Sequence, residues 1–369
     1  MSGRKRKVAV CGTGFGIFYA EAAKRSVELE LSAIVARGSV RSVKCAEKYG
    51  VPLYTGVDEL PDDIDMVCVV IRSSMLGGRG TDMALQCLQR GMSVILEQPV
   101  HHEDLKKLFK EALKNRCAYM TGNLYANLKE VRRFLQVSEK LVAAGSKLLY
   151  IRCGSSVQAF YPFVEILGRL TDGGRPEILL ADQQRGCFKQ VMGEIGGIPF
   201  SFQFNNDMNP RDPDNHMQIL HTFSCCYDSG RLELVDSRGP LIWYPRLNIP
   251  WHVFDNGGFP GTPEGYPEHV RKSNVIMLTP DQSEFEKPYY ISLENDWVSS
   301  IAIDLEKLKS MKDDRRALMS KAQQEQKYAK IWNDLSKQFG YALLNETLEQ
   351  SPILALDFKQ EALLPEERK

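Results

Sequence analysis

The chain has 369 residues, which is enough for about two domains and for a core that needs no disulfide or metal to stabilise it. Its 47 Lys and Arg residues balance its 47 Asp and Glu residues, and a net charge of zero argues against nucleic-acid binding, which requires clustered positive charge. Nine cysteines without a Cys-x-x-Cys pair are typical of reduced thiols. The apolar stretch behind the basic N-terminus is too short for a signal peptide, and no apolar run reaches the ~18 residues of a membrane helix. We therefore expect a cytoplasmic protein that binds neither nucleic acid nor membrane.

The first third of the chain alternates short apolar runs with amphipathic stretches. Strands are predicted at residues 7–11, 31–35, 65–71, 93–96 and 118–121, and helices at residues 18–24, 42–49, 81–90 and 103–115. Strands that alternate with helices form parallel sheets covered by helices. We therefore predict an α/β protein with an N-terminal Rossmann parallel sheet in residues 1–124.

The pattern changes after residue 124. Helices are predicted at residues 124–144 and 157–170, with a strand at 146–153 between them, and residues 176–243 are mostly strand-like with frequent turn signals. This pattern predicts a second, α+β domain in residues 125–296 that carries an open, mainly antiparallel sheet. The remainder, residues 297–369, is predicted to hold C-terminal helices as far as residue 349 and then a tail.

A glycine-rich turn lies between the first strand and the first helix. Its sequence is Gly12-Thr13-Gly14-Phe15-Gly16. Glycines let the backbone approach a pyrophosphate, and the helix N-terminus adds N–H groups and the positive end of a dipole. The third glycine comes one residue earlier than in the usual G-x-G-x-x-G motif, so the position of the turn in a βαβ series strengthens the interpretation. We predict that this turn binds a dinucleotide; the alternative is a purely structural turn.

The end of the second predicted strand indicates which dinucleotide is bound. NAD enzymes usually place an acidic residue here to hold the ribose hydroxyls. This chain instead has Arg37 and Ser39, with Arg41 close behind. No carboxylate is present to repel a 2′-phosphate, and guanidinium and hydroxyl groups can donate to one. We therefore predict NADP(H) as the cofactor; the alternative is that the arginines are solvated loop charges.

Three further strand ends should open on the same cleft, because ligands of such sheets lie at the carboxyl ends of the strands. Ser73 and Ser74 follow one of these strands and are predicted to line the phosphate or nicotinamide side of the cofactor, although loop serines often have no such role. The next strand leads into Glu97-Gln98, and the last leads to Tyr125. Glu97 and Gln98 are predicted to contact the cofactor.

The segment Glu97-Gln98-Pro99 resembles the Glu-Lys-Pro motif of the Gfo/Idh/MocA oxidoreductase family, which joins a Rossmann domain to an α+β domain with an open sheet. In the sugar dehydrogenases of that family the Lys serves catalysis. Gln98 stands at the Lys position here, and Gln cannot titrate or carry charge. The resemblance therefore implies an oxidoreductase, but the departure speaks against ordinary sugar-alcohol chemistry.

A narrower resemblance covers residues 8–250. The chain is similar to the thiazolinyl imine reductases of siderophore biosynthesis. The segments that carry this similarity are the glycine turn with its early third glycine, Glu97-Gln98-Pro99-Val100-His101, Tyr125, Asp212-Pro213-Asp214-Asn215-His216, Tyr227-Asp228-Ser229-Gly230 and Gly239-Pro240-Leu241-Ile242-Trp243.

We interpret the Asp-x-Asp-x-His segment as a turn and expect no metal, because Pro and Asn favour a turn and no second ligand cluster is evident.

This resemblance implies an NADPH-dependent reduction of a thiazoline C=N bond to a thiazolidine, on a substrate tethered to a carrier domain of a nonribosomal peptide synthetase. Hydride from the nicotinamide reaches the imine carbon, and the nitrogen then needs a proton from an acid or from water. Tyr125 is the first candidate acid, since the His that the family commonly shows is replaced by Gln98. Gln98 can only orient a ring or a water, whereas His101 can supply a titratable partner. The alternatives are a buried aromatic for Tyr125 and a helix cap for His101.

The open sheet commonly forms the dimer surface in this family, so we expect a homodimer. Two other functions stay open at this point. One is a Gfo/Idh/MocA-type dehydrogenase for a sugar or another carbonyl compound, and the other is a non-catalytic NADP-binding regulator.

Overall fold

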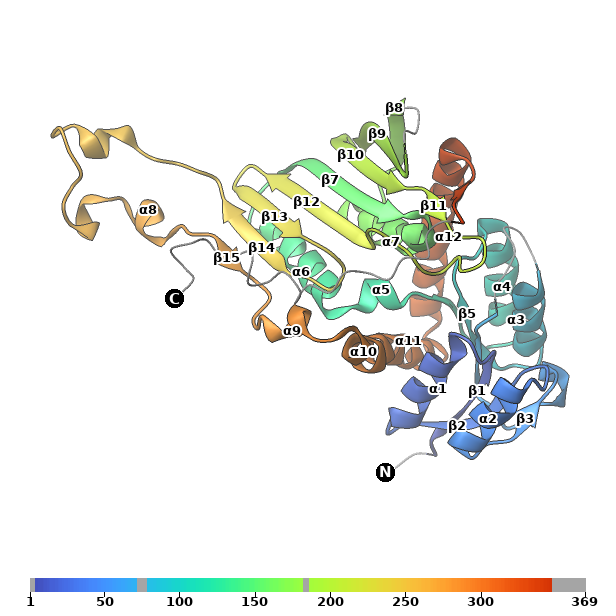
Figure 1. Ribbon diagram of the computed structural model, residues 1–369. Helices are drawn as coiled ribbons and strands as arrows, with labels where there is room; N and C mark the ends of the chain where they lie inside the picture. Colours follow the sequence, from blue (N-terminus) through green and yellow to red (C-terminus); the bar gives the residue numbers. More distant parts are fainter. Residues whose placement is uncertain (1–3, 72–77, 182–185, 347–369) are drawn as a thin grey trace.

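The computed structural model describes residues 4–71, 78–181 and 186–346 (Figure 1). The N-terminal sheet has six parallel strands in the order β3-β2-β1-β4-β5-β6. The strands are β1 (Arg6–Cys11), β2 (Leu29–Val35), β3 (Leu53–Tyr54), β4 (Met66–Val69), β5 (Ser93–Glu97) and β6 (Tyr119–Gly122). The helices between them are α1 (Gly16–Arg25), α2 (Val40–Tyr49), α3 (Arg79–Gln89) and α4 (His102–Lys114), with a short 3-10 turn, η1 (Val57–Glu59). The predicted Rossmann sheet is confirmed.

The second sheet has eight strands in the order β15-β14-β13-β12-β7-β10-β9-β8. All described pairs in it are antiparallel except β7 with β10, which confirms the predicted open, mainly antiparallel sheet. The strands are β7 (Leu148–Ser156), β8 (Pro176–Ala181), β9 (Phe188–Ile195), β10 (Ile198–Asn205), β12 (His221–Tyr227), β13 (Gly230–Leu234), β14 (Leu241–Pro245) and β15 (Ile276–Met277). Helices α6 (Lys129–Ala143) and α7 (Phe160–Leu170), the latter preceded by the turn η2 (Val157–Ala159), cover one face of this sheet (Figure 1).

The single helix predicted at residues 124–144 is wrong. The structure has a one-turn helix, α5 (Leu124–Asn127), and then α6, with Leu128 between them at φ −55° and ψ 141°. Leu128 is buried at this junction. The apolar period runs through both helices and cannot reveal the break, because the groups that hold α5 come from distant parts of the chain.

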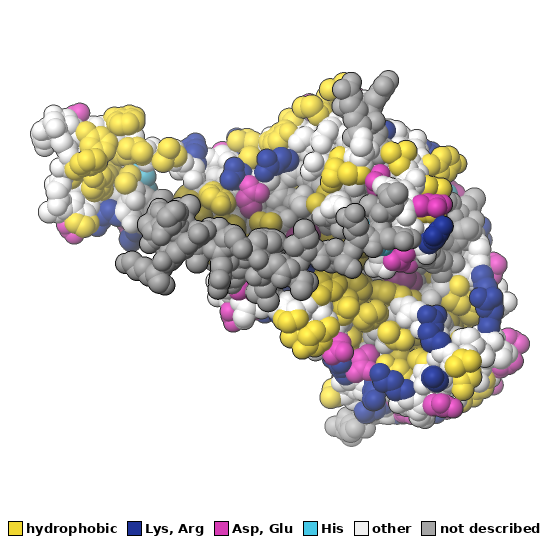
Figure 2. All heavy atoms as spheres, viewed as in Figure 1, with side chains coloured by type: hydrophobic (Ala, Val, Ile, Leu, Met, Phe, Trp, Pro, Cys, Tyr) yellow, Lys and Arg dark blue, Asp and Glu magenta, His cyan; other side chains and the backbone are white. Residues whose placement is uncertain are grey.

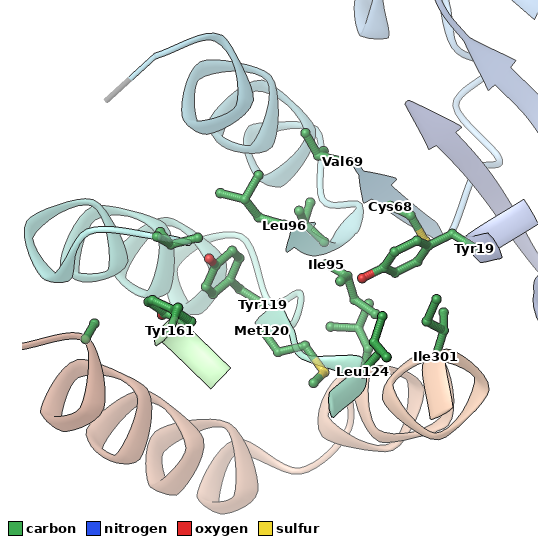
Figure 3. Packing of buried hydrophobic residues seen from close by; sticks show 14 of the residues in the cluster. Tyr19, Cys68, Val69, Ile95, Leu96, Tyr119, Met120, Leu124, Tyr161 and Ile301 are labelled. Carbon is green, nitrogen blue, oxygen red and sulfur yellow. The ribbon is translucent and has the colours of Figure 1, made fainter. Parts of the chain in front are cut away.

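The C-terminal helices return to the N-terminal sheet. A stretch of π-helix (Ser292–Trp297) leads into α11 (Val298–Met311), which packs against α1, α5, β5 and β6. Helix α12 (Arg315–Phe339) packs against α4 and α7. Figure 3 shows part of the core where α11 packs on α1 and α5, with Ile301 of α11 near Leu124 and Tyr19. The predicted helix as far as residue 349 is also wrong, because Gly340 at φ 78° ends α12 and β16 (Leu343–Leu344) then pairs with β11 (Asp207–Met208).

Residues 246–275 form an arm between β14 and β15 that projects from the edge of the second sheet (Figure 1). The arm holds η3 (Trp251–Phe254), η4 (Pro263–Gly265) and α8 (Glu268–Lys272) and is followed by α9 (Ser283–Glu286) and α10 (Tyr289–Ile291). Apolar side chains gather on its surface in Figure 2. The side chain of Trp251 in this arm is 76% exposed. Among the described helices, none has the length and apolar character needed to cross a membrane.

Candidate active site

The glycine turn has a backbone that only glycine fits at its first position. Gly12 has φ +97°, and a Cβ on it would lie 2.5 Å from the carbonyl oxygen of Val70. At the next element, Phe15 occupies the N-cap of α1, and no side chain caps the first-turn N–H groups of this helix. The amide of Gly16 lies at the positive end of the helix, whereas the next two amides, of Ile17 and Phe18, donate to the carbonyls of Gly14 and Phe15. The turn fits the predicted pyrophosphate site.

Three of the other predicted cofactor residues, Arg37, Ser39 and Arg41, follow strand β2. Arg41 reaches the glycine turn, since its Nη2 lies 3.8 Å from the position of a Cβ on Gly14. Arg37 is exposed after β2, and the exposed Ser39 caps α2 by accepting a hydrogen bond from the Ser42 amide at 3.3 Å. Thr13 and Gly16 are buried, the latter against Val10. Ser73 and Ser74 lie outside the described residues.

The carboxylate at the end of β5 is engaged inside the protein. Glu97 accepts a hydrogen bond from the hydroxyl of Tyr19 in α1. Burial, together with the negative charge of Asp304, raises the pKa of Glu97 to about 8 although the Tyr19 contact opposes the shift. The described contact of Glu97 therefore ties α1 to the sheet, and its predicted contact with the cofactor stays a prediction.

The next residue, Gln98, carries an unpaired buried acceptor. Its Oε1 is inaccessible and has no hydrogen-bond partner in the described parts of the chain. An unsatisfied buried acceptor costs about 1–3 kcal/mol. A hydrogen-bond donor on a bound group would remove this cost, and the carboxamide of a nicotinamide has one. Gln98 therefore fits the predicted dinucleotide.

His101 acts as the N-cap of α4. Its Nδ1 accepts from the amide of Glu103 at 3.2 Å, and its Nε2 lies 3.2 Å from Oδ1 of Asn333 in α12. Because an amide N–H can only donate and an amide oxygen can only accept, the ring is held with its proton on Nε2. Both nitrogens are occupied by protein groups, which corresponds to the capping alternative.

Tyr125 lies in α5 between two aromatic rings. Its ring meets that of His221 edge-on at 5.2 Å and that of Trp297 at 6.1 Å. Among the described residues, none forms a hydrogen bond with its hydroxyl. Burial raises the pKa of Tyr125 above its ordinary value, and the neighbouring Tyr289 and Glu97 add to the shift. The phenol is therefore protonated at neutral pH and free to donate.

His221 is a functional neighbour that the sequence analysis did not identify. It is fully buried on β12, where Nε2 donates to the carbonyl of Ala159 at 2.8 Å and Nδ1 accepts from the hydroxyl of Ser237 at 2.6 Å. Burial lowers the pKa of His221 to about 4. The imidazole is thus a fixed, neutral wall for the Tyr125 ring and does not compete as an acid.

Trp297 was also missed, and it connects the two halves of the site. Its ring lies 5.8 Å from that of Phe15 in the glycine turn and 6.1 Å from that of Tyr125. A continuous series of rings therefore runs from the glycine turn to β12. The structure brings the predicted proton donor and the predicted dinucleotide turn to one site, with rings from three distant segments. No local sequence pattern at Trp297 could have revealed this, because only the fold of the C-terminal helices places it there.

Two family models match parts of this chain. Residues 6–123 match the Gfo/Idh/MocA model, described as an oxidoreductase family with an NAD-binding Rossmann fold. Residues 146–244 match the model described as the C-terminal part of Irp3-like thiazolinyl imine reductases. A comparison with curated protein sequences found no match.

Several solved structures share the fold. GenD2 from gentamicin A biosynthesis, in complex with NAD, has a TM-score of 0.61 at 14% identity, over 90% of this chain and 93% of its own. KijD10, a 3-ketoreductase from Actinomadura kijaniata in complex with NADP, has a TM-score of 0.62 at 14% identity, over 92% and 99%. A dehydrogenase from Chromobacterium violaceum has a TM-score of 0.63 at 13% identity, over 91% and 95%.

The Rossmann sheet and its glycine turn define an NAD(P)-dependent oxidoreductase. Residues 6–123 are similar to the Gfo/Idh/MocA oxidoreductase family, and residues 146–244 are similar to the C-terminal part of Irp3-like thiazolinyl imine reductases.

Proposed function

We propose that this protein reduces the C=N bond of a thiazoline to a thiazolidine with NADPH, on a siderophore intermediate bound to a carrier domain of a nonribosomal peptide synthetase. The observation that carries the proposal is the match of residues 146–244 to the Irp3-like thiazolinyl imine reductases. Gln98 supports it, because this residue cannot supply the charge that Lys brings to sugar dehydrogenases at the same position.

The cofactor would be held by the glycine turn and by the residues around it. The amide of Gly16 and the positive end of the α1 dipole suit the pyrophosphate. Arg37 and Arg41 favour a 2′-phosphate, since both are exposed beside the turn and no carboxylate stands at the end of β2. When bound, NADPH supplies the hydride for the imine carbon.

Either Tyr125 or a water molecule would donate the proton to the imine nitrogen. The phenol is preferred over His101 because its hydroxyl makes no hydrogen bond to a described residue, whereas both nitrogens of His101 are engaged. Its raised pKa keeps the phenol protonated at neutral pH. His221 and Trp297 hold the ring from two sides.

A substrate panel tests the proposal. The expected result is oxidation of NADPH in the presence of an aryl-thiazoline thioester and no oxidation with sugar ketones. Turnover of a sugar ketone without turnover of the thiazoline would instead indicate a Gfo/Idh/MocA-type dehydrogenase. Tight NADPH binding with no turnover on either class would indicate a non-catalytic regulator.

We further propose a homodimer formed by the face of the second sheet opposite α6 and α7. That face has a hollow of about 540 Å³, lined by Arg152, Gln203 and Glu233 among others, and Leu179 and Met192 of the same sheet are exposed. Light scattering coupled to size exclusion should give twice the mass of one chain. A monomer would contradict this part of the proposal.

A further inference from the structure

One carboxylate of α11 holds both ends of the helix that carries Tyr125. Oδ2 of Asp304 accepts from the backbone amide of Asn123 at 3.0 Å, immediately before α5. Oδ1 of the same side chain accepts from Nδ2 of Asn127, the last residue of α5, at 2.7 Å. A helix of one turn has little stability of its own, so its orientation depends on such contacts.

The contacts to α5 from α11 and from Trp297, the residue immediately before α11, form a single stripe. Trp297 packs on the Tyr125 ring, the carbonyl of Ser300 accepts from Asn127 Nδ2 at 3.2 Å, and Asp304 bridges the two ends. These positions are three and four residues apart and therefore lie on one side of a helix. Figure 1 shows α5 alongside α11, and the two helices pack directly on each other. The same stripe thus sets both the ring wall and the attachment of α5.

The carboxylate of Asp304 is buried but fully paired. It is 2% exposed, and besides its two amide donors it has Lys307 Nζ at 3.6 Å. Lys307 also donates to Oδ1 of Asn127 at 2.7 Å, so the amide of that residue has a fixed orientation. On the other end, Asn123 donates from Nδ2 to Glu165 of α7 at 2.8 Å and accepts through Oδ1 from the amide of Ala126. These hydrogen bonds at both ends of α5 therefore fix the orientation of the helix that carries Tyr125.

We propose that Asp304 is a positioning residue of the reductase reaction, which holds α5 at both ends and thereby aims the hydroxyl of Tyr125 at the imine nitrogen. The inference rests on the proposed function for the identity of the reaction. It extends the active site to α11, which lies outside both segments matched by the family models, residues 6–123 and 146–244.

The kinetic test is Asp304→Asn with Glu306→Gln as its matched control. Asparagine keeps the shape but presents an N–H₂ group to one of the two donors, so one end of α5 is released. Glu306 lies on the same helix but is exposed and pairs with Lys309, so the same change there should leave kcat unaltered. Asp304→Asn should lower kcat about tenfold with KM for NADPH unchanged, which marks loss of a contribution made in the transition state.

A double variant separates positioning from general stability. If Asp304 acts through the phenol, Asp304→Asn should have no further effect on kcat in a Tyr125→Phe background, because coupled residues are not additive. Equal fold losses of kcat in both backgrounds would overturn the proposal. Asn127→Ala, which releases the C-terminal end of α5 from Asp304, Ser300 and Lys307, serves if Asp304→Asn does not fold. It should give a loss of kcat that likewise disappears in the Tyr125→Phe background, and a loss that persists there would overturn the proposal.

A second readout needs no substrate and keeps the two proposals distinguishable. With 3-fluorotyrosine incorporated at position 125, the ¹⁹F resonance should shift or broaden in Asp304→Asn and remain in place in Glu306→Gln. An unchanged resonance in Asp304→Asn would overturn the positioning role whatever the enzyme reduces. Absence of thiazoline turnover in the unaltered protein would overturn the proposed function alone, and the resonance would then decide the role of Asp304.

Discussion

Removing the hydroxyl of Tyr125 separates a chemical role from a structural one. The Tyr125→Phe substitution retains the ring contacts with His221 and Trp297. It removes an oxygen that has no hydrogen-bond partner among the described residues, so it leaves none of their buried groups unpaired. The free energy of unfolding should therefore change by no more than about 0.5 kcal/mol, as for substitutions that break no specific contact.

The effect on catalysis should be much larger. A positioned acid contributes about 10²–10⁴-fold to a rate, and water can replace part of this contribution. We expect kcat to fall at least tenfold, which corresponds to about 1.4 kcal/mol in the barrier. Steady-state kinetics with a thiazoline substrate give kcat, NADPH fluorescence gives the affinity for the cofactor, and thermal unfolding gives the stability.

The pattern of the three results decides the interpretation. A fall in kcat with unchanged NADPH affinity and unchanged melting temperature supports proton donation by the phenol. An unchanged kcat would remove Tyr125 from the chemistry and leave water or the substrate as the proton source. A parallel loss of kcat and stability would show that the residue is structural.

Two further predictions concern the cofactor and the pH dependence of stability. Arg37→Asp should raise the apparent KM for NADPH far more than that for NADH, because an acidic group repels the 2′-phosphate; equal effects on both cofactors would contradict the assignment of NADPH. Burial raises the pKa of Glu97 to about 8 in the folded protein, above the value of about 4.3 in the unfolded chain. The protonated carboxyl group therefore contributes its full stabilisation at low pH. This contribution to the free energy of unfolding is lost as the pH rises toward 8. Urea unfolding at pH 5 and pH 9 should therefore show the unaltered protein losing stability relative to Glu97→Gln as the pH rises, whereas a constant difference would refute the raised pKa.

Those parts of the fold that depend on local pattern were predictable from the sequence. The four residues of β4 are all buried, and such a continuous apolar run marks a strand covered on both faces. The glycine turn was predictable because Gly12 needs a positive φ that other residues rarely adopt. These features require only neighbouring residues to be known.

The rest of the site depends on contacts between distant residues. His221 meets Tyr125 from β12, and Asp304 reaches α5 from a helix 177 residues beyond Asn127. Neither residue stands in a motif, and the break at Leu128 is invisible in a continuous helical period. The sequence alone allows His101 to be either an acid or a helix cap. Its contact with Asn333, which is distant in the chain, shows that the second ring nitrogen is also engaged.

Transfer of a labelled hydride tests the central claim most directly. The protein is incubated with NADPH that carries deuterium at C4 of the nicotinamide and with an aryl-thiazoline thioester, and the product is analysed by mass spectrometry and NMR. The account predicts a thiazolidine with one deuterium on the carbon of the former C=N bond when one of the two C4 epimers is used. A thiazoline recovered unlabelled and unreduced with both epimers would contradict it.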